Sequence, residues 1–281
     1  MTGNVSHLNY DDAIVFPAQP GAAHLHMYWG NTVCHAGSTY SSLRQNGSAT
    51  NEGSSLMRSS YWMPAPLIKF GGAWNVPIPN FITMYYKRGP AGGPSIPRGL
   101  RMITRQPATF VIWTPDYSVS EKAGWQGLPA LLAKLRPGWH FAIEISFPSA
   151  WDGLRVDSAD HMSHISNVVQ ASHPHLLPHI SEKPMWTVGE GEDWSSFMLS
   201  SDLHMGAAPG ETFHADYFEA GDDEIREEWT ANAVNRQLNC SGGDLGSGRG
   251  LKRPPSFTFE QGGRVPLASV PIGGEYRLIP A

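Results

Sequence analysis

Histidine and aspartate cluster in three short segments of this sequence, and these residue types can bind a metal ion or transfer protons. The densest segment is 151–164, which holds three aspartates and two histidines in fourteen positions and contains no lysine. In each of the other two segments, two such residues stand at positions i and i+2. The candidate site residues are Asp157, Asp160, His161 and His164 in the first segment, His24 and His26 in the second, and His214 and Asp216 in the third.

Imidazole and carboxylate groups together suit two kinds of site. They form the ligand set of zinc and of other divalent ions, and near neutral pH they act as general acids and bases. As ligands of one divalent ion, whose identity the sequence leaves open, we expect His24, His26 and His214. As catalytic groups, which either orient an imidazole ligand or transfer a proton themselves, we expect Asp157, Asp160, His161, His164 and Asp216.

Each segment also has a simpler interpretation. Aspartates in a polar loop commonly cap turns, and a pair of histidines on a strand is compatible with a solvent-exposed face. The functional hypothesis therefore requires the fold to bring the three segments together. It predicts that His24, His214 and either His161 or His164 surround a common point.

Short strands are expected to hold these residues. Residues 24–29 alternate between Gly21 and Gly30, which predicts a strand whose residues 24 and 26 face the same side. Residues 140–147 predict a strand before the segment 151–164. Two helices are predicted, at 120–136 from the leucine spacing and at 223–238 after a capping Asp222. Further short strands are predicted at 81–86, 100–103, 110–113, 186–188, 194–199, and, as a pair of edge strands, at 256–259 and 276–279.

Composition indicates a globular β-rich chain. Of the 281 residues 41% are hydrophobic and only 16% are charged, while 30 glycines and 23 prolines suit many short strands joined by turns. No internal repeat and no linker divides the sequence. We therefore predict one domain over residues 1–281, mainly β, with a β-sandwich or jelly-roll architecture and two peripheral helices.

Several classes of protein are disfavoured. The net charge of −5 comes without a basic stripe, which argues against a nucleic-acid partner. No stretch approaches the ~18 apolar residues of a membrane-spanning helix. The first residues lack the features of a signal peptide, which leaves a cytoplasmic protein or one whose signal lies outside this sequence. Two cysteines, Cys34 and Cys240, do not make a disulfide framework, and we expect them to stay unpaired.

Short motifs follow one another in a recognisable order. They include His24-Leu25-His26, Arg58-Ser59-Ser60-Tyr61-Trp62-Met63-Pro64, Trp151-Asp152-Gly153, Asp157-Ser158-Ala159-Asp160-His161, Phe213-His214-Ala215-Asp216 and Leu238-Asn239-Cys240-Ser241-Gly242-Gly243. Together they resemble the domain of unknown function numbered nineteen ninety-six, in its bacterial form. The resemblance covers about residues 20–250 and leaves 251–281 as a C-terminal extension. It implies a secreted protein of a family often attached to carbohydrate-binding modules.

The chain departs from this family at its cysteines. The family usually has cysteines where Ala150 stands, near Val169 or Gln170, and near Ala233. The resemblance therefore implies that cross-links have been lost and that Cys240 lacks its partner.

Two functions remain open from the sequence. The first is a hydrolase or lyase that acts on a polysaccharide or oligosaccharide, with Trp29, Trp62 and Trp151 stacking on sugar rings. The alternative is a non-catalytic glycan-binding or cell-surface module with a structural metal site. A structural site is normally closed by four ligands. Because this sequence offers more candidates than four, the enzyme is favoured.

Overall fold

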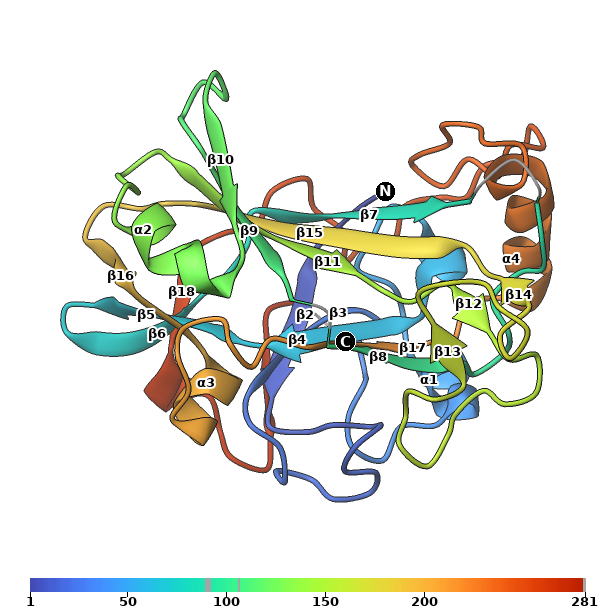
Figure 1. Cartoon of the computed structure of the whole chain (residues 1–281), viewed down its shortest axis with the longest axis horizontal. Helices are drawn as coiled ribbons and strands as arrows, with labels where there is room; N and C mark the ends of the chain where they lie inside the picture. Colours follow the sequence, from blue (N-terminus) through green and yellow to red (C-terminus); the bar gives the residue numbers. More distant parts are fainter. Residues whose placement is uncertain (89–91, 106, 280–281) are drawn as a thin grey trace.

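Two six-stranded antiparallel sheets face each other in the computed structural model, which describes residues 1–88, 92–105 and 107–279 (Figure 1). The first sheet has the order β1 (Thr2–Gly3), β7 (Phe81–Lys87), β15 (His179–Thr187), β11 (His140–Ser146), β9 (Thr109–Trp113), β10 (Ser120–Ala123). The second has the order β19 (Glu275–Arg277), β2 (Val5–Asn9), β3 (His26–Gly30), β4 (Ser60–Pro64), β17 (Ala215–Phe218), β8 (Arg101–Thr104). The predicted mainly β, sandwich-like fold is confirmed.

Smaller elements complete the structure. A four-stranded sheet has the order β16 (Glu192–Leu199), β5 (Pro66–Phe70), β6 (Ala73–Pro77), β18 (Arg264–Pro266), and a three-stranded one the order β13 (Ile165–Ser166), β12 (Ala150–Trp151), β14 (His175–Leu176). The α-helices are α1 (Tyr40–Asn46), α2 (Leu128–Leu132), α3 (Ser200–Met205) and α4 (Asp223–Trp229). No helix in the described part of the chain is long and apolar enough to cross a bilayer.

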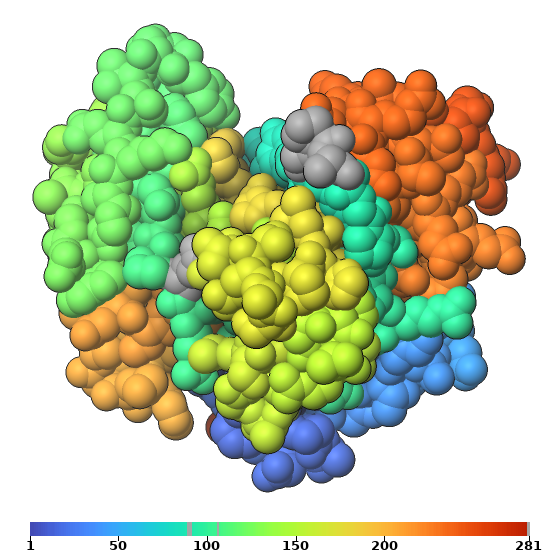
Figure 2. All heavy atoms as spheres, turned by 45° about the vertical axis from the view of Figure 1, so that its right-hand side comes forward, coloured from blue at the N-terminus to red at the C-terminus, as the bar shows by residue number. Residues whose placement is uncertain are grey.

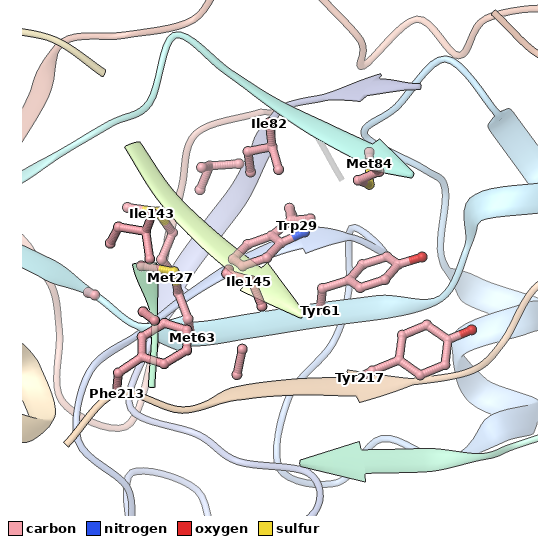
Figure 3. Packing of buried hydrophobic residues seen from close by; sticks show 14 of the residues in the cluster. Met27, Trp29, Tyr61, Met63, Ile82, Met84, Ile143, Ile145, Phe213 and Tyr217 are labelled. Atoms are coloured by element: carbon pink, nitrogen blue, oxygen red, sulfur yellow. The ribbon is translucent and has the colours of Figure 1, made fainter. Parts of the chain in front are cut away.

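The main core lies between the two large sheets (Figure 3). Met27 and Trp29 alternate along β3 and point toward the first sheet, where they meet Ile143 and Ile145 of β11. These side chains are at most 1% exposed. The period of two in the sequence of β3 and β11 therefore produces the sandwich, because it puts one apolar row of each strand between the sheets.

The opposite face of the second sheet is also covered. Tyr28 and Trp62 stack there with ring centroids 5.3 Å apart, and Ile14 of the 10–24 loop belongs to the same buried cluster. His26 precedes Tyr28 by two residues and therefore lies on this same outer face. The 10–24 loop thus buries the surface on which the candidate site residues stand.

The structure corrects both helix predictions. Residues 120–136 begin as β10, which pairs with β9, and only Leu128–Leu132 form an α-helix, because glycines at 124 and 127 interrupt the segment. Asp222 caps α4 as predicted, but the α-helix ends at Trp229 and continues as a π-helical turn, Thr230–Val234. The spacing of the leucines in 120–136 thus predicted correctly that these leucines are buried, but it predicted too long a helix.

The tail pairs differently from the prediction. Residues 256–259 form no strand, and β19 pairs with the edge of β2 instead. The first strand of the site is also shorter than predicted, since β3 begins at His26 and leaves His24 outside it. Cys34 and Cys240 are both free, as expected.

Candidate functional site

Three histidine rings meet at the outer face of the second sheet. The side chains of His24, His26 and His214 each bring one ring nitrogen within 4.8 Å of the others. Ring centroids are 4.3 Å apart for His24 and His26, 5.0 Å for His24 and His214, and 5.8 Å for His26 and His214. The predicted histidine set from the first and last segments is thus assembled in space.

Backbone carbonyls orient two of these rings. His26 Nδ1 donates to the carbonyl oxygen of Asp11 at 2.8 Å, and His214 Nδ1 donates to that of Thr212 at 3.0 Å. Because a carbonyl oxygen only accepts, each ring carries its proton on Nδ1 and a lone pair on Nε2. The Nε2 atoms of His24 and His26 are buried and have no hydrogen-bond partner among the described residues. Neutral imidazoles held in this way are ready to act as ligands.

Burial keeps the three imidazoles neutral. Loss of solvent, together with the charge of the neighbouring His214, lowers the pKa of His26 to about 3. Burial likewise lowers the pKa of His24, with His26 and His214 adding to the effect, and it lowers that of His214. A metal ion binds to an imidazole nitrogen that carries no proton. The low pKa values therefore keep these three rings in the form that binds a metal ion.

Two carboxylates also lie close to His26. Ligand atoms of Asp12, His26 and Asp216 also come within 4.8 Å of one another. Both carboxylate oxygens of Asp216 are buried without a partner among the described residues, and burial, followed by the charge of Asp12, raises its pKa well above the ordinary range. An unpaired buried carboxylate is costly unless it is protonated or beside a cation.

The donor set fits one divalent ion. Three imidazole nitrogens with an adjacent carboxylate are typical ligands of zinc and of similar first-row transition ions. His26 has only its Nε2 free, since Nδ1 is bonded to Asp11. The histidine group and the carboxylate group share this one nitrogen, so the cluster offers a place for a single ion.

A cavity of about 430 Å³ opens onto the cluster. Its lining includes His24, His214 and Asp216, together with apolar side chains from the 10–24 loop and from 205–213. His204 of α3 also lines it, with its ring centroid 6.4 Å from that of His24. The cavity gives a substrate access to the histidines.

Asp202 holds the turn that presents the Thr212 carbonyl. Its buried carboxylate accepts hydrogen bonds from the backbone N–H groups of Leu199, Gly210 and Thr212 and from Thr212 Oγ1. The sequence motif around His214 gave no sign of this contact, because Asp202 precedes it by twelve residues.

Replacing Asp202 with alanine should lower the free energy of unfolding by about 3 kcal/mol, because four donors lose a buried acceptor. Urea denaturation at pH 7 measures this. Asp193 is the matched control, since it is an exposed aspartate that accepts from Ser195. Asp193→Ala should cost less than about 1 kcal/mol. Equal small effects of both changes would show that Asp202 does not hold the turn.

The segment 157–164 does not join the cluster. No possible metal-binding group among the described residues includes His161 or His164. His161 Nδ1 bonds to Asp157 Oδ1 at 2.8 Å, and buried His164 bonds to Ser158 Oγ and to the Arg101 carbonyl. The histidines of segment 157–164 therefore make their hydrogen bonds within the segment and to β8. The predicted single site of three segments is corrected to a site of two, built from the segments of His24 and His214.

Asp160 likewise serves its own loop. Its Oδ1 accepts from Ser158 Oγ and from the N–H groups of Met162 and Ser163. These bonds lower the pKa of Asp160, that from Ser163 most strongly. This is the turn-capping role that aspartates commonly take in polar loops.

The tryptophans are not available as predicted. Trp29 and Trp62 are fully buried, and Trp29 Nε1 donates to Glu182 within the core. Neither can stack on a sugar. Trp151 is partly exposed but donates to the Arg155 carbonyl at 2.5 Å, and it lines no part of the cavity beside the histidines.

Sequence reasoning missed two neighbours of the cluster. Asp12 reaches it from the 10–24 loop, and Arg105 lines the cavity just after β8. Asp12 belongs to an acidic pair, Asp11-Asp12, and that pair was the one available signal. Arg105 has no such signal because strand pairing alone brings it there.

Comparison with known proteins gives one result. A family model described as "Domain of unknown function (DUF1996)" matches residues 12–220. This range contains every residue of the cluster. No curated protein matches. No solved structure matches either.

Proposed function

Because the chain belongs to the DUF1996 family, we propose that it is an enzyme that cleaves a polysaccharide or oligosaccharide, by hydrolysis or elimination, at one divalent metal ion. The observation that carries the metal part is the convergence of His24, His26 and His214 beside a cavity, with their nitrogens held neutral. The carbohydrate part rests on the family resemblance in the sequence. A secreted location is proposed on the same ground.

The residues of the cluster have different roles in this proposal. His24, His26 and His214 would hold the ion. The ion would supply Lewis acidity toward an oxygen of the substrate or of water. Asp216 lies beside His26 and is the group placed to take or return a proton, since burial raises the pKa of its carboxyl group. Asp11 and Thr212 keep the two bonded rings in one tautomer.

Protein prepared without chelator should contain about one divalent transition ion per chain, because the cluster offers one ion a place. Elemental analysis measures this. Chelation should abolish cleavage of the polysaccharide that a screen identifies, and the ion alone should restore it. A metal content of zero, with no increase in melting temperature on adding zinc, copper, manganese or calcium, would contradict the proposal.

A binding module with a structural ion is the second candidate. Its supporting observation is that a carboxylate oxygen of Asp216 comes within 4.8 Å of a ring nitrogen of His26, and in a module this carboxylate would close the site as a fourth ligand. A structural ion contributes directly to folding, whereas a catalytic one leaves an open position. Chelation that unfolds the protein would favour the module. Chelation that leaves circular dichroism unchanged while activity disappears would favour the enzyme.

A further inference from the structure

A second hollow adjoins the cavity beside the histidines. It has a volume of about 440 Å³ and is lined by Asp160, Met162, Ser163 and neighbouring residues of the segment 157–167. Ile103 and Arg105 line both hollows. Figure 2 shows the yellow-green lobe around residues 150–175 standing beside the gold surface of α3, with a depression between them. The two hollows therefore meet at the end of β8.

Strand β8 ties the lobe to the histidine cluster. Arg101 at its start binds Asp157 at 2.9 Å, and the Arg101 carbonyl accepts from His164 Nε2 at 2.7 Å. Its other edge pairs with β17, where Ile103 is the register partner of Asp216. Strand β8 thus sets the position of the lobe relative to the histidine cluster, and the two hollows meet at its end. Asp160 of this segment consequently lines the groove, while Asp157 and His164 hold the segment against β8.

Arg105 is the cation at this junction. It is the only lysine or arginine among the described residues that line the two hollows. Its exposed guanidinium forms no hydrogen bond or ion pair with a described residue. It lines the same cavity as His214 and Asp216, so its charge faces the cluster across that cavity. Among the described residues, four acidic side chains also line the two hollows, namely Asp12, Glu211, Asp216 and Asp160. Glu211 accepts from the Ala208 N–H, and Asp160 accepts from Ser158 Oγ.

We propose that the two hollows form one groove for an extended anionic glycan, and that Arg105 binds a carboxylate of that glycan between the cluster and the lobe. This inference rests on the proposed function, because it names the substrate class of the same site. A planar guanidinium without a protein partner matches a carboxylate with two parallel hydrogen bonds. Hydroxyl and amide groups of Ser163, Ser166 and Asn167 in the second hollow suit the hydroxyls of a neighbouring sugar unit.

The test compares two oligosaccharides of equal length on the metal-loaded full chain. Calorimetry should show that a galacturonic acid hexamer binds at least about tenfold more tightly than cellohexaose. Arg105→Ala should remove this preference and leave the affinity for cellohexaose unchanged. Arg105→Lys should keep part of the preference, since it keeps the charge but loses the paired hydrogen bonds. Arg236→Ala, which removes an exposed arginine outside both hollows, should behave as the parent protein.

Three results would overturn the inference. They are equal affinity for the two hexamers, an equal loss for both in Arg105→Ala, and no binding of either by protein that contains its ion. The metal content of each sample separates this inference from the proposed function. If the acidic hexamer binds in an Arg105-dependent way to protein that holds no ion, the groove is supported and the metal-dependent function fails.

Discussion

His26→Ala should lower the affinity for a divalent ion by about a hundredfold or more. His26 is the member of the cluster that lies within reach of both the other histidines and the two carboxylates. Its Nδ1 bond to the Asp11 carbonyl leaves Nε2 as the only ligand atom, so alanine removes one whole ligand. Even loss of a group that only orients a ligand costs ten- to a hundredfold in affinity. Competition against a chromogenic chelator measures the change.

His164→Ala is the matched control for this result. His164 is also a fully buried histidine, but it bonds to Ser158 and to the Arg101 carbonyl in the lobe. Its loss should lower the melting temperature and leave the affinity for the ion within about threefold of the parent. If His164→Ala weakened ion binding as strongly as His26→Ala, the ion would not lie where the cluster places it.

Stability should fall between about pH 4.5 and pH 8 because of Glu182. This side chain on β15 is fully enclosed in the core, and burial raises its pKa to about 8 although Trp29 Nε1 donates to it. The folded protein therefore holds a proton that the unfolded chain releases above its ordinary carboxyl pKa. The contribution to stability is fully present below the unfolded pKa and is lost as pH rises through the folded one, at about 1.4 kcal/mol per pH unit.

Glu182→Gln isolates this effect, since glutamine keeps an oxygen for Trp29 and does not ionise. The difference in unfolding free energy between Glu182→Gln and the parent should grow in favour of the variant from pH 5 to pH 8, by several kcal/mol. Urea denaturation across this range measures it. Glu144→Gln on neighbouring β11 is the control. Burial acts to raise the pKa of Glu144, but Lys122 and Lys183 outweigh it and lower that pKa, so no such growth is expected. A pH-independent difference for Glu182→Gln would refute an enclosed, protonated carboxyl group.

The sequence pattern predicted the structure correctly where a single strand or a single helix cap determined it. The alternation along residues 24–29 predicted that His24 and His26 share one face, and Met27 and Trp29 pack in the core on the other; Asp222 predicted the start of α4. Patterns that depend on competition between elements were less informative. Residues 120–123 became a strand because β9 has a free edge for them, and their own sequence does not show that edge.

The residue types of the site were determined by the sequence alone. His24, His26 and His214 were predicted as ligands from their chemistry and spacing, and the structure places them together. The same chemistry also marked His161 and His164, which bond within their own loop. The sequence does not distinguish a ligand histidine from one bonded within its own loop. Burial and hydrogen-bond partners depend on residues far away along the chain.

The tertiary structure decided which of these residues meet. Pairing of β17 with both β4 and β8 puts Asp216 between Trp62 and Ile103, and the 10–24 loop then brings Asp12 over the same face. These contacts join residues between about 110 and 200 positions apart, so no periodicity within a segment reports them. Sequence determines which side chains are capable of the chemistry. Register and burial determine which of them keep a free lone pair.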